Sequence, residues 1–182
     1  MDVLLRRLAL VACVLALAVG VAACGEDEPG VDEPAREGLA LDLDGVDYNV
    51  FITRQLNPAF APDDTYYTGP EPAPDETLYG VFILACNNSD ERRSTADTFT
   101  IVDNQGNEFE PEQVDAGSII AYEPGELDPK ECIPAPGSLA QLGPEGASML
   151  LFRLPLRVTE NRPLELEIHG EGDEKLTVEL DL

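Results

Sequence analysis

Strict alternation of apolar and polar side chains near the end of the chain constrains the fold more than any other feature. Two alternating runs, 164–168 and 176–182, flank the turn sequence Gly170-Glu171-Gly172-Asp173. A period of two places the apolar side chains of a strand on one face, whereas a helix needs a period near 3.6. The pattern predicts a hairpin with one buried face and one acidic, solvated face. Its apolar residues are Leu164, Leu166, Ile168, Leu176, Val178, Leu180 and Leu182.

Strand patterns also occupy most of the chain from Leu39 onward. The segment 78–86 is apolar on both faces, as expected of a central strand covered on both sides. A Gly-containing turn at 104–106 predicts a hairpin, and only 139–142 resembles a helical turn. Seven to nine short strands over residues 39–182 predict an all-β, antiparallel β-sandwich. The remaining predicted strands are 46–54, 98–103, 107–110, 118–122 and 148–156.

The start of the chain has the pattern of an export signal. Arg6 and Arg7 precede an apolar run over 8–23, which is shorter than the roughly 20 residues that a spanning helix needs. Val21-Ala22-Ala23-Cys24 resembles the bacterial lipobox, in which the cysteine is lipidated and becomes the new N-terminus. We therefore expect a signal peptide at 1–23 and a lipid on Cys24, placing the protein on the extracytoplasmic face of the cell membrane. The alternatives are an uncleaved anchor helix and a plain secretory signal.

An acidic, proline-containing stretch follows the lipobox. Residues 25–38 hold six acidic side chains and few apolar ones, so burial of apolar surface cannot offset the entropy lost on ordering the stretch. We expect residues 24–38 to be a disordered tether; the alternative is a protein-binding tail.

The charge balance excludes one class of partner. Asp and Glu number 36 against 11 Lys and Arg, which gives a formal net charge of −25. Nucleic acids and anionic lipid surfaces attract clustered cations. We therefore expect no nucleic-acid partner, and membrane contact through the lipid alone.

Two cysteines remain after the signal segment and Cys24 are set aside. In an exported protein an even pair predicts a disulfide, here Cys86 with Cys132, which would hold the loop 123–137 against the central strand. The alternative is a pair of buried free thiols.

Several motifs together resemble a family of uncharacterised bacterial lipoproteins with an immunoglobulin-like domain. They are the lipobox, the acidic spacer, Cys86-Asn87-Asn88-Ser89, the run 99–103 with Gly106 and Phe109, and Gly146 before 151–155. The resemblance spans about residues 46–170 and implies an immunoglobulin-like sandwich. It brings no catalytic residues. The chain departs from the pattern in the loop after Asn57 and around Cys132.

The sequence offers few groups for catalysis or metal binding. His169 is the single histidine, and no serine-hydrolase motif accompanies it, so we expect a half-exposed strand residue and no enzyme; a cryptic hydrolase is the remote alternative. Asp42, Asp44 and Asp47 supply oxygen ligands suited to Ca²⁺, but their spacing is not that of an EF-hand. We expect no cofactor, with a Ca²⁺-stabilised domain as the alternative.

The long loop 57–76 is the candidate contact region. It holds five prolines with Phe60, Tyr66 and Tyr67, and loops of this length in compact domains are usually functional or disordered. These rings form either a contact surface for an envelope protein or small ligand, or a cover for an open sheet edge. The function expected from the sequence is therefore a non-catalytic, lipid-anchored binding module of the cell envelope.

Overall fold

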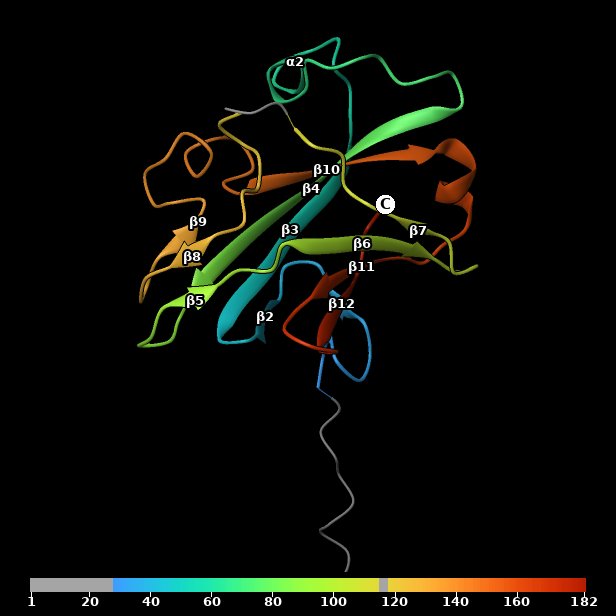
Figure 1. The fold of residues 1–182 in the computed structure, drawn as a ribbon. Coiled ribbons are helices and arrows are strands. Elements are labelled where there is room, and N and C mark those ends of the chain that lie inside the picture. The colour runs from blue at the N-terminus through green and yellow to red at the C-terminus, as the bar shows by residue number, and fades with distance from the viewer. Residues whose placement is uncertain (1–27, 115–117) are drawn as a thin grey trace, which may run out of the picture.

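Two sheets facing each other form the body of the protein (Figure 1). The structure, a computed structural model, describes residues 28–114 and 118–182. The predicted signal segment 1–23 and the lipid-attachment residue Cys24 lie outside the described residues. Within the described part, no helix has the length and apolar character needed to cross a membrane.

Each sheet is built from antiparallel neighbours, apart from one short parallel pair. The first sheet has the order β10-β4-β3-β2, with β9 paired to the end of β4. The second has the order β1-β12-β11-β6-β7. The strands of the first sheet are β2 (Ala40–Leu43), β3 (Val46–Leu56), β4 (Glu76–Asn87), β9 (Cys132–Ile133) and β10 (Ser148–Pro155). Those of the second are β1 (Ala35–Arg36), β6 (Thr98–Asp103), β7 (Glu108–Phe109), β11 (Leu164–His169) and β12 (Lys175–Glu179).

Four short elements lie outside these two sheets. Strands β5 (Arg93–Ser94) and β8 (Glu126–Leu127) pair with each other, and helix α2 (Asp63–Tyr66) lies in the loop between β3 and β4. A 3-10 helix, Leu156–Glu160, follows β10.

The order of the strands is that of an immunoglobulin fold. There, strands A, B and E lie side by side in one sheet and strands C, F and G in the other. Strands β3, β4 and β10 follow the A-B-E order, and β6, β11 and β12 follow the C-F-G order. The expected all-β, immunoglobulin-like sandwich is confirmed. Seven strands in the described residues have four or more residues, and five further strands have two.

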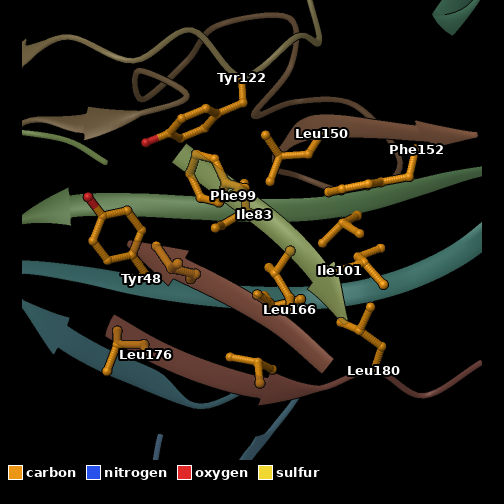
Figure 2. Packing of buried hydrophobic residues seen from close by; sticks show 14 of the residues in the cluster. Tyr48, Ile83, Phe99, Ile101, Tyr122, Leu150, Phe152, Leu166, Leu176 and Leu180 are labelled. Atoms are coloured by element: carbon orange, nitrogen blue, oxygen red, sulfur yellow. The ribbon is translucent and has the colours of Figure 1, made fainter. Parts of the chain in front are cut away.

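The predicted C-terminal hairpin provides much of the core between the sheets. Leu166 pairs with Val178 and Ile168 with Leu176 in antiparallel register, and all four side chains are buried. Figure 2 shows Leu166 and Leu176 packed toward side chains of the opposite sheet, among them Tyr48 and Ile83. The alternation in the sequence therefore reflects a single buried face, as predicted.

Strand β4 is covered on both sides, as its continuous apolar sequence predicted. Tyr79, Val81 and Ile83 point into the core between the sheets. Leu78 and Phe82, at the intervening positions, belong to a second cluster on the outer face of the sheet. Because side chains alternate between the two faces of a strand, β4 contributes to both hydrophobic clusters.

The segment 118–122 does not form the predicted strand. It makes one isolated bridge, Ala121 with Met149, whose flanking hydrogen bonds run from Met149 N to Ile120 O (2.6 Å) and from Tyr122 N to Met149 O (2.9 Å). Ile120 is buried in the outer cluster and Tyr122 in the core between the sheets. Residues two apart would share a face in a strand. The chain here instead crosses the edge of the sheet, which ends the pairing.

The predicted disordered tether is ordered over its last eleven residues, 28–38. Strand β1 pairs in parallel with β12, aligning Ala35 with Val178, and Ala35 is buried. Gly30 accepts a hydrogen bond from Thr177 N (2.7 Å), has φ +89°, and would place a Cβ 2.9 Å from Leu41. Strand pairing and a few buried apolar side chains are therefore enough to attach this acidic segment to the second sheet. The sandwich therefore includes residues that precede Leu39, among them Ala35 and Arg36 of β1.

Candidate functional site

The loop 57–76 lies over the outer face of the first sheet. Tyr66 and Tyr67 are only 7% and 8% exposed, and the Tyr66 ring meets Phe82 edge-on at 6.2 Å between centroids. These two rings cover the sheet, but they cover its face and not the edge that the sequence suggested. Phe60 is 68% exposed and is the one aromatic side chain of the predicted contact set that faces solvent.

A partly buried arginine network fixes the first half of the loop. The Arg54 guanidinium donates to Asp63 Oδ1 (2.7 Å) and to Glu145 Oε1 (2.6 Å), and lies over the Phe82 ring at 5.1 Å. Tyr66 donates its hydroxyl to Glu145 Oε2 (2.7 Å). Since the two carboxylates come from α2 and from the loop before β10, this network ties both loops to β3.

The ionisation of these groups follows from the network. Hydrogen bonding to Asp63 raises the pKa of Arg54 against the opposing effect of burial. Burial raises the pKa of Asp63, but the bonds from Arg54 and from Asn57 N outweigh it and lower that pKa below its ordinary value. Burial and the neighbouring Glu145 raise the pKa of Tyr66. Arg54 and Asp63 are thus charged and Tyr66 is neutral around neutral pH.

A second arginine network fixes the other half of the loop. Arg153, on β10, donates to Glu112 Oε1 (2.6 Å), and its guanidinium lies 3.5 Å from Glu76 Oε2. It also donates to the Tyr67 hydroxyl (2.8 Å), which donates in turn to Pro70 O (2.8 Å). Hydrogen bonding to Glu112 raises the pKa of Arg153, so its charge is permanent.

A hollow of about 640 Å³ opens beside this second network, between the loop and the segment 112–114. We call it the α2 hollow. The volume is within the range of about 300–1,000 Å³ typical of small-ligand sites. Arg153 is its single cation and is already held by protein groups, so the free polar surface is acidic. Its lining includes Tyr67, Glu71, Glu76, Glu112 and Arg153.

Two of the three aspartates considered as Ca²⁺ ligands, Asp44 and Asp47, accept hydrogen bonds from other residues of the fold. Asp44 and Gly45 form the β2–β3 turn with φ 55° and 80°, the backbone of a tight hairpin turn, and Asp44 Oδ2 accepts from Glu171 N (2.7 Å). Asp42 lies opposite Asp47 on the paired strands, and Asp47 accepts from the Asn88 amide. In residues 28–114 and 118–182, no group of three or more His, Cys, Asp and Glu side chains is arranged to hold a metal ion.

His169 is a strand residue, as expected. It ends β11, its side chain is 36% exposed, and Nε2 lies 3.6 Å from Glu167 Oε2 on the same strand. Its cross-strand neighbours are Thr98 and Lys175. This setting places no serine or cysteine nucleophile among its paired neighbours.

The predicted disulfide is present. Cys86 and Cys132 are joined with an S–S distance of 2.10 Å, and the same two residues are paired across β4 and β9. The bond therefore attaches the loop 123–137 to the end of the central strand.

The two arginine networks were not anticipated from the sequence. Arg54 and Arg153 interrupt strands that are otherwise rich in apolar residues, and this is the one sequence signal that points to buried charge. With 36 acidic residues in the chain, the sequence gives no basis for selecting Glu112 and Glu145 as partners.

No protein-family model matches the chain, and no curated protein matches its sequence. Three solved structures are similar to this chain. The yjhA protein of Bacillus subtilis has a TM-score of 0.53 at 11% identity, over 80% of this chain and 99% of that one. A candidate lipoprotein of the same species, ycdA, has a TM-score of 0.51 at 10% identity over 80% of this chain, which spans only 38% of ycdA. An uncharacterised β-sandwich protein of Clostridium difficile has a TM-score of 0.45 at 14% identity, over 85% of this chain and all of that one. The first two similarities show a shared fold.

Proposed function

We propose that this protein is a non-catalytic, lipid-anchored module of the cell envelope that binds a partner through the face carrying the α2 hollow and Phe60. The position of that face in the molecule is the main support for this proposal. The N-terminal end of the described chain, with β1, and the loop with α2 lie at opposite ends of the molecule (Figure 1). A lipid on Cys24 would therefore leave the α2 face pointing away from the membrane.

Two further observations support a binding role. The loop is held rigidly by the Arg54 and Arg153 networks, so binding a partner would cost little ordering entropy. Phe60 stands exposed on that rigid support, as an aromatic anchor of an interface would. The candidate lipoprotein ycdA, which shares the fold, is compatible with a membrane-anchored role.

The anchor is tested by exchanging the lipidation residue. Cys24→Ala should move the protein from the membrane fraction to the soluble fraction of fractionated cells, and metabolic labelling with an alkynyl fatty acid should mark the unchanged chain alone. Membrane retention of the variant without label would contradict a lipid anchor.

The exposed face is tested with a photo-crosslinking amino acid at position 60 in intact cells. A discrete crosslinked species that disappears with Glu112→Ala but persists with Glu126→Ala, an exposed acid on β8, supports the α2 face as the binding surface. The matched probe at Val31, which is exposed at the opposite end, should give no such species. Equal crosslinking from positions 31 and 60 would refute a specific surface.

A further inference from the structure

A second hollow, of about 750 Å³, lies on the other sheet between the β6–β7 hairpin and the 3-10 helix Leu156–Glu160. We call it the hairpin hollow. It shares no lining residue with the α2 hollow, so a ligand bound here is independent of the proposed function. Three carboxamides and one guanidinium in the lining of the hairpin hollow can form hydrogen bonds with a ligand. One aromatic ring also lines the hollow. These residues are Gln105, Asn107, Phe109, Arg157 and Asn161.

Two of the carboxamides, those of Asn107 and Asn161, are positioned by Asp103, a 4% exposed carboxylate at the end of β6. Its Oδ1 accepts from the backbone N–H groups of Gln105 and Asn107, both at 2.9 Å. Its Oδ2 accepts from Asn107 Nδ2 (2.8 Å) and Asn161 Nδ2 (3.1 Å). Burial raises the pKa of Asp103, but these four bonds outweigh it and lower the pKa to about 2. Asp103 is thus ionised and saturated by protein groups, and its role is to fix the amides.

The fixed amides keep free hydrogen-bonding groups. Gln105 uses one N–H to reach Asn161 Oδ1 (3.2 Å), and Asn107 uses one N–H for Asp103, so Gln105 Oε1 and Asn107 Oδ1 remain as acceptors. Each amide also keeps a second N–H. The lining therefore presents donors and acceptors side by side, with the Asn107 and Asn161 amides held by Asp103 and the Gln105 amide held by Asn161.

Arg157 adds a donor group with no competing partner. It forms none of the ion pairs or side-chain hydrogen bonds found in residues 28–114 and 118–182, whereas Arg36, Arg54, Arg92 and Arg153 each contact carboxylates. Glu108 and Glu160 also line the hollow and outnumber this cation. The local charge therefore disfavours an anionic ligand.

We propose that the hairpin hollow binds a neutral oligosaccharide. Sugar hydroxyls both donate and accept, which suits alternating amide N–H, amide oxygen and guanidinium groups. The C–H face of a pyranose is apolar and packs on an aromatic ring, and the half-buried Phe109 is the ring that the lining offers for this contact. The volume is in the range of small-ligand sites, and the preset amides reduce the entropy cost of binding.

The test is isothermal titration calorimetry of the full chain, purified in a detergent without a sugar headgroup, with chitotriose, cellotriose and maltotriose. At least one trisaccharide should bind with a dissociation constant of about 1 mM or tighter. Hydrogen–deuterium exchange should slow on binding at backbone amides 104–109 and 157–161. Gln105→Ala combined with Arg157→Ala should weaken binding by about tenfold or more, because each removes hydrogen bonds to the ligand.

Both substituted side chains are exposed, so the double variant should keep the melting temperature of the parent chain. Arg92→Ala, which removes an exposed arginine near β5, is the matched control and should bind as the parent does. The proposal is overturned if none of the three sugars binds at about 20 mM. It is equally overturned if binding or protection is unchanged in the double variant.

Discussion

Tyr48 and Tyr122 hold one residue, Ala96, from two sides. The Tyr48 hydroxyl accepts from Ala96 N at 2.6 Å, and the Tyr122 hydroxyl donates to Ala96 O at 3.0 Å. Both rings are buried in the core between the sheets (Figure 2). Ala96 lies just before β6, so the pair fixes the start of that strand relative to the first sheet.

Removing the Tyr48 hydroxyl should destabilise the fold. Tyr48→Phe leaves the partly buried Ala96 N–H without its acceptor; a fully buried unsatisfied donor costs about 1–3 kcal/mol of the free energy of unfolding, so we expect a loss near the lower end of that range. Urea unfolding followed by circular dichroism measures this cost. Tyr79→Phe is the control, because Tyr79 is also buried but its hydroxyl makes no such bond to Ala96, and its effect should be smaller. Equal costs for the two variants would contradict the role given to Ala96.

Stability should fall at alkaline pH. Burial raises the pKa of Tyr48, Tyr79 and Tyr122 above the ordinary value near 10. The unfolded chain therefore loses these phenolic protons at lower pH than the folded chain. The stabilisation is complete below about pH 10 and is lost as the pH rises toward the folded-state pKa values. Absorbance of tyrosinate at 295 nm should rise together with unfolding; an early rise in the still folded protein would contradict it.

Breaking the Arg54 network should cost more than breaking the Arg153 network. Glu145→Ala removes an acceptor from both Arg54 and Tyr66, and a hydrogen bond to a charged group contributes about 1.5–3 kcal/mol. Glu112→Ala removes the more exposed partner of Arg153, and such an ion pair contributes about 0–1 kcal/mol. Parallel urea titrations of the two variants give the comparison. The reverse order would show that Glu145 is not the main tie between the loops.

Loss of the disulfide should destabilise the domain and release one loop. Cys86 and Cys132 are separated by 46 positions, and the chain-entropy relation assigns such a loop about 4 kcal/mol. The double variant Cys86→Ala with Cys132→Ala should unfold at lower urea concentration. Limited proteolysis should then cut first within 123–131. Unchanged stability, with cuts elsewhere, would show that β9 is held by its strand pairing alone.

The sequence predicted the parts of the fold that depend on local periodicity. The β11–β12 hairpin and β4 agree with the pattern because a buried face requires apolar side chains at alternate positions. The segment 118–122 has the same local pattern but crosses the sheet edge. Its path depends on hydrogen bonds with Met149, which is distant in the sequence. The order in 28–38 likewise depends on contacts with β12, about 140 residues away.

The candidate site was predictable only in outline. A long proline-rich loop with aromatic residues indicated a special region, and the structure places Tyr66 and Tyr67 on the sheet and Phe60 in solvent. The carboxylate partners of Arg54 and Arg153 come from four separate segments, namely α2, β4, the segment 112–114 and the loop before β10. Pairing of charges has no periodic signature in the sequence. The hairpin hollow depends in the same way on Asn161 meeting the 103–107 turn.

The two-residue pairing of β1 with β12 makes the domain extensible under load. A force applied at the N-terminal end acts first on this short pair, long before it reaches the larger sheets. Once the pair yields, residues 28–38 can span at most about 3.3–3.6 Å each, or roughly 35–40 Å in total when fully extended. Separation of β1 from β12 would therefore lengthen the molecule under force while the rest of the sandwich stays folded.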